Sequence, residues 1–424
     1  MKGLKYGIDE IPKPNELISL SIHWLIIAAP ILIIGGRIVA DFQFTEAFEK
    51  TLYMQKLFLI SGLTILAQIL IGHRLPIISG PSAILIAGIY ATNDPSAYTS
   101  ITICGLLLFF FAITGKMRIL QSLFSQKIVS IVFLLIIITL LPLIIDLISS
   151  EGSAFYNAVF SIIFVSSLFL LAKFLKGFWS TNMLFIALIF GTVIYLSIFP
   201  REFKPIEIGY VDFHFSFSFK PEILIPFLFF YLALAINDFS SIYSVGKMLE
   251  ANGLEERVKK GVLITGISNF FSGLFNVVGT VNYAMSPGII AITGSASRFS
   301  LLPAGIFLIL FALFPPLIHF FAMIPKAVIA SVFVYILCHQ LLFALKFLKI
   351  DDFSSAISIF IPLILGSLAT FAPSQFFDFF PILKPVFGNG FIVGLLVAVL
   401  IERISRERDK FISKTEGHGK EGCG

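Results

Sequence analysis

Apolar runs long enough to cross a lipid bilayer recur along almost the whole chain, from the first at Leu17 to Gly35 to the last, which ends at Leu400. A membrane-spanning helix needs about 20 predominantly apolar residues. Apolar residues make up 57% of the 424 residues and charged residues only 13%, about half the charged share of a soluble domain. The sequence therefore predicts an all-α membrane protein, which leaves pores, pumps and transporters as open classes.

The runs divide into fourteen predicted segments, seven in each half. The third, Ile77 to Tyr90, and the tenth, Tyr283 to Thr293, are too short for ordinary spanning helices. At an offset of 206 residues, Pro81 in the third matches Pro287 in the tenth, and the glycines that follow match as well. The pattern predicts an internal repeat, in which the second half of the chain corresponds to the first and the helix of each short segment is interrupted. Simple kinks in ordinary helices are the alternative.

Basic residues are distributed unevenly between the two sets of connections. With the N-terminus inside, 22 of the 30 Lys and Arg residues fall on the cytoplasmic side and eight on the other, as the positive-inside bias predicts. Both termini are then cytoplasmic, in a cell inner membrane, and the net charge of +5 needs no nucleic-acid partner. Because seven spans per half is odd, the second half is inverted. The predicted fold is fourteen transmembrane segments in a 7+7 inverted repeat, with discontinuous third and tenth segments.

Ionisable side chains inside the segments are few, and each is by default a functional candidate. Asp238, preceded by Asn237 in the eighth segment, can exchange a proton, hold a cation or accept hydrogen bonds from a substrate. A helix-packing carboxylate is the alternative. His23 lies in the first segment. Histidine is the side chain whose charge ordinarily changes near physiological pH, so His23 is the second candidate for proton coupling, with a packing role as its alternative.

The two short segments contribute backbone as well as side chains. Helix N-termini and amides freed at a break can hold carbonyl or anionic groups in the middle of a membrane. Polar side chains lie at or beside both breaks: Ser82, Asn282, Tyr283, Ser286 and Thr293. The three cysteines, Cys104, Cys338 and Cys423, are far apart and predict neither a disulfide framework nor a metal site. The sequence therefore points to small-molecule binding without a cofactor.

With these residues in view, the chain resembles the nucleobase cation symporters of the uracil and xanthine permease type, also called the nucleobase ascorbate transporter family. His23 follows Ile22 where that family has Gln-His, and Gly80-Pro81-Ser82 looks like its Gly-Ser-Ser. Asp238 falls where the family has a substrate-binding glutamate, and a shift of one residue would place Asn237 there. Met285 to Arg298 is similar to the signature of the tenth segment, and Gly388 to Gly394 to the start of the last span.

The resemblance implies two domains that move against each other like an elevator, commonly in a homodimer formed through the gate domains. It assigns 1–122 and 222–322 to the core, 123–200 and 323–402 to the gate, 201–221 to an extracellular joint and 403–424 to a cytoplasmic tail. It further implies a nucleobase substrate between the broken segments, coupled to H⁺ or Na⁺, with Asp238 and His23 in coupling. The candidate substrate-binding residues are Asp238, Ser82, Ala83, Ser286, Gly288, Met285 and Asn237.

The chain departs from the family at one informative place. Met285 and Ser286 replace the family's Gln or Glu and Asn, the pair that grips the amide edge of the nucleobase, so the substrate does not follow from the fold. A transporter of an anion or small organic acid, resembling sulfate permeases, is therefore the alternative. A channel or a membrane enzyme is a further alternative, although the spans lack the clustered Asp, His or metal ligands that an enzyme would need.

Overall fold

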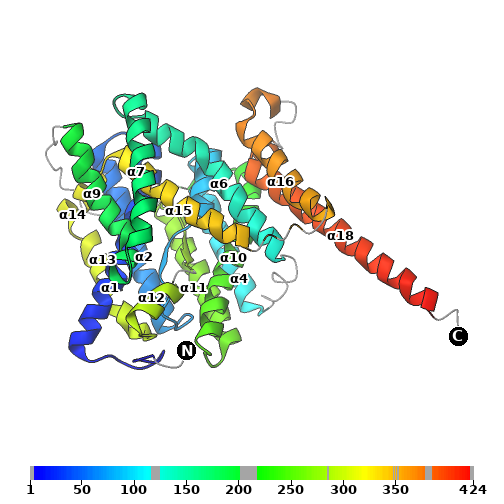
Figure 1. Ribbon diagram of the computed structural model, residues 1–424, viewed down its shortest axis with the longest axis horizontal. Helices are drawn as coiled ribbons and strands as arrows, with labels where there is room; N and C mark the ends of the chain where they lie inside the picture. Colours follow the sequence, from blue (N-terminus) through cyan, green and yellow to red (C-terminus); the bar gives the residue numbers. More distant parts are fainter. Residues whose placement is uncertain are drawn as a thin grey trace. The chain divides into compact units, whose positions relative to one another are not determined.

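The computed structural model describes residues 4–115, 125–200, 217–283, 286–346, 348, 350, 353–377 and 384–420, and helices dominate it (Figure 1). The chain divides into two compact units. The first comprises Met1–Leu120 and Leu140–His339, and the second Gln121–Thr139 and Gln340–Gly424. Residues 201–216 of the predicted joint, and Met285, lie outside the described residues.

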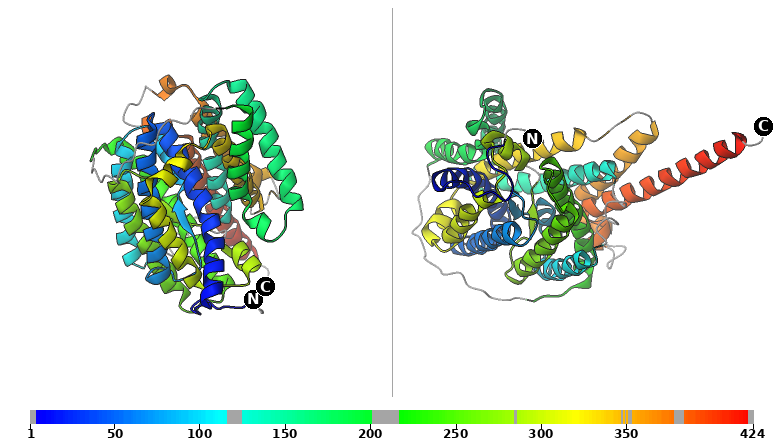
Figure 2. Two further views of the ribbon diagram at one scale, coloured as in Figure 1. Left: turned by 90° about the vertical axis from the view of Figure 1, so that its left-hand side faces the viewer. Right: turned by 90° about the horizontal axis from the view of Figure 1, so that it is seen from below.

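The first unit holds most of the helices and both strands. In the right-hand view of Figure 2 many of its helices are seen end on, so they run roughly parallel. In chain order it contains α1 (Pro14–Gln43), α2 (Ala47–Leu70), β1 (Ser79–Pro81), α3 (Ala83–Thr92), α4 (Ser96–Ile113), the end of α6 (Gln126–Ser149), α7 (Ala154–Phe174), α8 (Phe178–Thr181), α9 (Met183–Ile198), α10 (Pro221–Met248), α11 (Leu254–Leu274), β2 (Thr280–Asn282), α12 (Ser286–Thr293), η1 (Arg298–Leu301), α13 (Leu302–Ala312), α14 (Pro315–Ala322) and most of α15 (Lys326–Lys346).

The second unit is smaller. It contains the start of α6, the end of α15, α16 (Phe353–Phe371), η2 (Ser374–Phe377), α17 (Lys384–Phe387) and α18 (Gly390–Lys420). Helix α18 continues past Leu400, where the last apolar run ends, so most of the predicted polar tail prolongs that helix.

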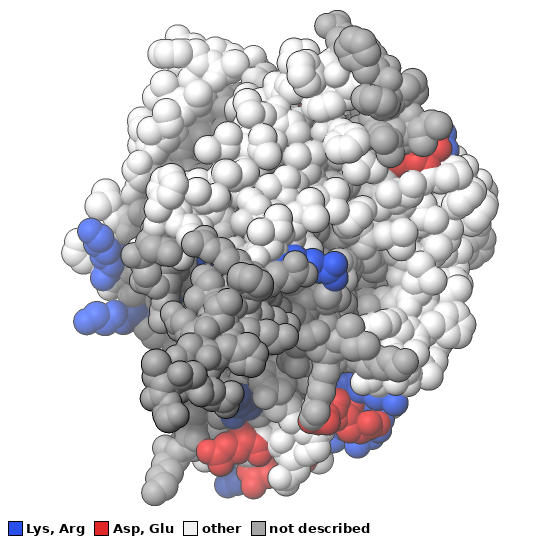
Figure 3. All heavy atoms as spheres, turned by 90° about the vertical axis from the view of Figure 1, so that its right-hand side faces the viewer, with Lys and Arg blue, Asp and Glu red and all other residues white. Residues whose placement is uncertain are grey.

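Eight helices within the described ranges are long and apolar enough to cross a membrane. A ninth span results if α13 and the adjoining α14 are counted as one; they meet at a bend of 86°, which coincides with Pro315 and Pro316 at the start of α14. Large apolar side chains on these helices face outward, for example Ile162 and Ile163 on α7, which are 67% and 63% exposed. Such surfaces are stable against lipid but not against water, and the described residues in the upper part of the face drawn in Figure 3 are mostly uncharged. The prediction of a helical protein that crosses the membrane several times is confirmed.

Connections that the sequence assigns to one side of the membrane touch one another in the first unit. Beyond the end of α10, Arg257 at the start of α11 donates to the carbonyl oxygen of Arg74 at 2.7 Å. At the start of α10, Lys220 forms an ion pair with Asp94 at 2.5 Å. The two groups of connections thus lie at opposite ends of a helix of 28 residues, or about 42 Å.

The ion pair of Asp94 with Lys220 gives the protein a weak pH dependence. Burial alone would raise the pKa of Asp94, but hydrogen bonds from Lys220 and Ser96 outweigh it and hold that pKa below its usual value. The pair therefore stabilises the fold above the usual pKa of Asp, about 4, and its contribution is lost as the pH falls through the lowered pKa. Lys220 is 46% exposed, so solvent screens the pair and its contribution to stability is small. We expect Asp94→Asn to lower the melting temperature slightly at pH 7. Thermal unfolding in detergent should show this difference shrinking as the medium is acidified to pH 3.

Glycines bring α4 and α11 into backbone contact. A Cβ atom on Gly105 of α4 would lie 2.6 Å from the backbone nitrogen of Phe270, and one on Gly266 of α11 would lie 2.6 Å from that of Phe109. Small residues at such crossings let membrane helices gain van der Waals contacts that larger residues prevent. The two helices form one tightly packed pair beside the strands.

Candidate functional site

Strands β1 and β2 form an antiparallel pair inside the first unit, although one belongs to each half of the chain. Ser79 lies opposite Asn282, and Pro81 opposite Thr280. Every residue of both strands is buried. Non-helical backbone at membrane depth needs partners from the protein, and the pairing of the strands supplies them. Helices α3 and α12 begin shortly after the two strands, so the pair fixes where both short helices start.

Two glycines make room for the strand pair. A Cβ atom on Gly80 would lie 3.0 Å from the ring of Tyr283, whose hydroxyl donates to the carbonyl oxygen of Pro81 at 2.6 Å. A Cβ atom on Gly35 of α1 would lie 2.5 Å from the ring of Pro81. The short strand β1 is therefore held between α1 on one side and Tyr283 on the other.

Asp238 is attached to strand β2. The side chain lies on α10 and is fully buried, and its Oδ1 accepts hydrogen bonds from the backbone nitrogen of Asn282 at 2.8 Å and from Asn282 Nδ2 at 2.9 Å. Its Oδ2 is buried and has no hydrogen-bond partner within the described part of the chain. A buried acceptor without a donor is costly, so this oxygen is available to a ligand that brings an N–H or O–H group.

A polar layer continues from Asp238 toward α2 and α11. Asn282 Nδ2 donates also to Thr265 Oγ1 at 3.3 Å, and Gln68 Nε2 donates to the same hydroxyl at 3.1 Å. On the other side of Asn282, Ser79 Oγ donates to Oδ1 at 2.5 Å. Buried polar networks of this kind fix one arrangement of their elements when their members are paired. The layer ties α2, α10 and α11 to the two strands.

The starts of the short helices carry two of the predicted serines. Ser82 caps α3, because its Oγ accepts from the backbone nitrogen of Leu85 at 3.4 Å. Ser286 is the first residue of α12, and its buried Oγ has no partner among the residues that the structure describes. The first amides of a helix have no partner inside it and carry a positive partial charge. Both helix starts can therefore hold a carbonyl oxygen of a ligand.

The remaining predicted residues lie in different surroundings. Ala83 is the first residue of α3, and Gly288 lies in the first turn of α12. Asn237 is half-buried beside Asp238. His23 is also half-buried, and its Nδ1 contacts the carbonyl oxygen of Ser19 in its own helix at 2.8 Å. The hydrogen bonds of Asp238 come from β2, so the structure connects the carboxylate to Asn282 and not to His23.

Three members of the polar layer were not among the candidates from the sequence: Gln68, Thr265 and Ser79. The signal that identified Asp238, a polar side chain in an apolar run, applies equally to Gln68. Thr265 and Ser79 carry no such signal, because Ser and Thr are common in membrane helices, where they bond to their own backbone. Within the described ranges, no group of three or more His, Cys, Asp or Glu residues could hold a metal ion.

The chain matches the model of the Permease family over residues 15–375. It is 23% identical to a putative purine permease of Clostridium perfringens in an alignment 426 positions long, which covers 96% of this chain and 94% of that protein. It is 24% identical to a xanthine permease of Bacillus subtilis over 352 residues, or 78% of this chain and 79% of the relative.

Among solved structures, the transmembrane domain of a cyanobacterium bicarbonate transporter, BicA, is similar with a TM-score of 0.62 and 15% identity, covering 92% of this chain and 99% of that one. At this identity the likeness concerns the fold, which is that of known membrane transporters. The family match extends over most of the chain and includes both strands and both short helices of the site. The chain therefore belongs to the permease family of the xanthine and uracil type, and it is a membrane transporter and not an enzyme.

Proposed function

We propose that the protein imports a nucleobase or a closely related purine or pyrimidine together with a proton or sodium ion. One observation carries the proposal: among the residues that the structure describes, a carboxylate oxygen, Asp238 Oδ2, is buried without a partner beside the strand pair from which both short helices start. A nucleobase offers ring N–H donors and carbonyl acceptors in one plane. The carboxylate oxygen accepts the former, and the first amides of α3 and α12 donate to the latter.

The hydroxyl of Ser286 adds a second polar contact. Its Oγ is buried without a partner within the described residues, so it can donate to a ligand or accept from one. A polar site of this kind selects strongly, because an analogue that lacks the matching groups leaves buried protein groups unpaired. Asp238 Oδ2 is enclosed by protein in this structure, so binding includes an opening of the core around it.

The proposed mechanism moves the core, residues 1–122 and 222–322, against the gate, residues 123–200 and 323–402. Tight helix contacts inside the core support it as one moving body: α4 packs on α11, and Gly62 of α2 meets Gly305 of α13, where a Cβ atom would lie 2.9 Å from the carbonyl oxygen. In this proposal fourteen segments form the 7+7 inverted repeat, both termini are cytoplasmic, and the gate domains form a homodimer. Asp238 carries the coupling ion, and His23 contributes to coupling from α1.

The alternative substrate, an anion or small organic acid, fits the site less well. An anion would face the unpaired carboxylate oxygen of Asp238, and like charges at close range repel strongly away from water. A nucleobase N–H meets the same oxygen as a hydrogen-bond donor. The likeness of the fold to a bicarbonate transporter does not alter this, because function resides in the site and not in the fold.

Uptake by proteoliposomes tests the proposal. We expect labelled xanthine, uric acid, uracil or adenine to accumulate with saturation under an inward proton or sodium gradient, and unlabelled competitors to reduce it. Collapse of the relevant gradient should abolish the accumulation and so identify the coupling ion. The same uptake measurement with labelled sulfate and labelled bicarbonate tests the alternative, transport of an anion. If no nucleobase saturates or competes, the nucleobase proposal is wrong.

A further inference from the structure

The N-terminal segment before α1 lies along the residues that follow the short helix α12. We call residues 4–13 the N-terminal strap. Lys5 N donates to the carbonyl oxygen of Gly294 at 2.8 Å, and Arg298 N donates to that of Ile8 at 3.0 Å. Between them Tyr6 and Ser295 form a parallel bridge. The strap thus pairs in strand fashion with the chain just beyond α12, the helix that begins with Ser286.

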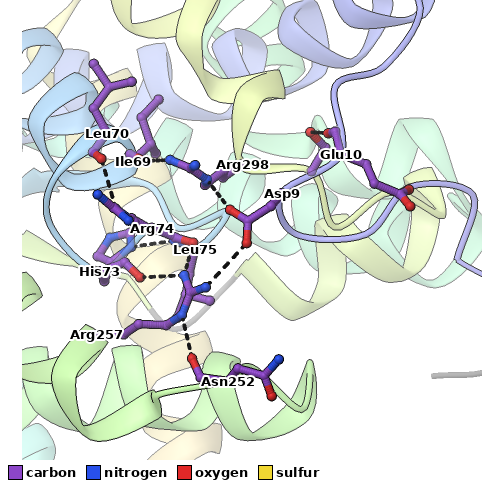
Figure 4. Close-up of polar contacts among 11 residues, drawn as sticks. Asp9, Glu10, Ile69, Leu70, His73, Arg74, Leu75, Asn252, Arg257 and Arg298 are labelled. Carbon is purple, nitrogen blue, oxygen red and sulfur yellow. Dashed lines mark hydrogen bonds and ion pairs between the residues drawn. The ribbon is translucent and has the colours of Figure 1, made fainter.

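Asp9 of the strap joins two arginines from distant parts of the chain, as Figure 4 shows. Its Oδ1 accepts from Arg298 Nε at 2.7 Å, and its Oδ2 accepts from Arg257 Nη2 at 3.4 Å. Both guanidinium groups are largely buried, with side chains 13% and 16% exposed. Arginine pairs such as these are directional, because the planar guanidinium presents its donors in fixed positions.

Each arginine also binds carbonyl groups at the end of α2 or in the connection just after it. Arg298 donates through Nη1 to the carbonyl oxygen of Ile69. Arg257 donates through Nη1 to those of Arg74, at 2.7 Å, and His73, at 3.3 Å. The last carbonyls of a helix lack partners inside it. Asp9 therefore connects the segment after α12 to the end of α2 and to the start of α11, where Arg257 lies.

The strap is itself fixed to α1. Tyr6 Oη donates to Glu16 Oε2 at 3.0 Å, and Lys5 Nζ lies 2.6 Å from the same carboxylate oxygen. Glu16 stands in the first turn of α1, where a carboxylate is also favoured by the helix dipole. The strap is therefore held at two places, through Lys5 and Tyr6 to α1 and through Asp9 to the two arginines. The segment that follows α12 pairs with the strap between these two places.

We propose that Asp9 is a positioning residue for substrate binding, and that it acts through Arg298 and Arg257 to hold α12 in place. The helix has only eight residues, so its two ends are about 12 Å apart. A displacement of the backbone at Gly294 therefore also displaces Ser286 at the other end of the helix. Asp9 touches no part of the strand pair and does not contact substrate. The expected effect on transport rests on the proposed function. The expected effect on the position of α12 does not, since the strap contacts are present without substrate.

Two measurements on Asp9→Asn test the proposal. The first needs no substrate: amide hydrogen exchange of residues 294–298 should become several-fold faster, because Ala296 and Arg298 donate to carbonyls of the strap, while exchange at Asn282 and in α3 stays unchanged. The second is transport: the apparent KM should rise about three- to fivefold, the equilibrium effect of a partly exposed ion pair, with the maximal rate nearly unchanged.

Three further variants separate positioning from general stability. Asp9→Glu should restore the KM, because it keeps the carboxylate. Glu10→Gln is the matched control, since Glu10 lies in the same strap and its side chain accepts a local hydrogen bond from Gly7 N at 2.8 Å, while its contact with Ser297 is made by the backbone carbonyl, which the substitution keeps. In an Arg298→Gln background, Asp9→Asn should add little, because the residues act as one unit.

Unchanged exchange at 294–298 in Asp9→Asn would overturn the proposal, as would an equal KM increase in Glu10→Gln. Faster exchange with an unchanged KM would also overturn it, since the strap would then be structural only. If wild-type protein takes up no nucleobase at all, the proposed function fails while the exchange arm still decides whether Asp9 holds the end of α12.

Discussion

Uptake driven by an ion gradient is expected to fall at least about tenfold when Asp238 is replaced by asparagine, while the protein still reaches the membrane in folded form. A hydrogen bond to a charged group contributes about 1.5–3 kcal/mol, or about 10- to 100-fold. The asparagine oxygen can still accept both hydrogen bonds that Asn282 donates at 2.8 and 2.9 Å. The group in place of Oδ2 is then a donor, which can neither accept from a nucleobase N–H nor carry a proton. Initial rates in proteoliposomes, with and without the gradient, measure the loss.

Two companion variants make the result interpretable. Glu222→Gln removes a carboxylate from the exposed first turn of the same helix and should leave uptake unchanged. Asp238→Ala removes the acceptor altogether. It leaves the buried backbone N–H of Asn282 unpaired, at about 1–3 kcal/mol, and leaves Asn282 Nδ2 with Thr265 Oγ1 as its acceptor, so it should lower the melting temperature in detergent where Asp238→Asn does not. Undiminished gradient-driven uptake by the asparagine variant would exclude Asp238 from the mechanism.

Much of the helical architecture follows from the sequence because apolar runs in a bilayer have few alternatives. A span without internal hydrogen bonds is excluded there, so run length alone predicts a helix, and Asp238 stands out as a carboxylate within such a run. The match between the two halves of the sequence at an offset of 206 residues agrees less well with the structure. It placed Pro81 on Pro287, but Pro81 ends strand β1 whereas Pro287 lies in the first turn of α12. The corresponding helix starts are Ala83 and Ser286, which a comparison of prolines alone does not reveal.

Contacts between distant segments could not be predicted. The first apolar run ends at Gly35, yet α1 continues to Gln43, which brings Arg37 and Asp41 into the helix as an ion pair at 2.9 Å. Arg37 Nη2 also donates to the carbonyl oxygen of Ile324 at 2.9 Å. Hydropathy treats these charges as the end of a span, since it has no information about a partner almost three hundred residues away. The same holds for Asp9 and its two arginines, and for the link from Asp238 to Asn282.

The close crossing of α4 and α11 predicts the largest effect on folding. We expect Gly105→Leu to prevent accumulation of folded protein, and Gly105→Ala to lower the melting temperature clearly. Even a single Cβ atom at this position would lie 2.6 Å from the backbone nitrogen of Phe270 and 2.9 Å from the carbonyl carbon of Asn269. Backbone atoms cannot rotate away as a flexible side chain can, so the helices must separate. Overpacking in a well-packed interior costs about 1–3 kcal/mol or more.

Thermal unfolding in detergent and size-exclusion profiles measure this effect, and a neighbour on the same helix provides the control. Leu107 is 49% exposed, so Leu107→Phe adds volume to α4 without entering the crossing and should leave the melting temperature unchanged. The polar layer depends on the same crossing, because Thr265 and Asn269 of α11 bind Asn282 Nδ2 and the backbone nitrogen of Thr280. Partial separation of α4 and α11 in Gly105→Ala should therefore also weaken substrate uptake. Normal stability and uptake in Gly105→Leu would mean that the two helices do not cross at this distance.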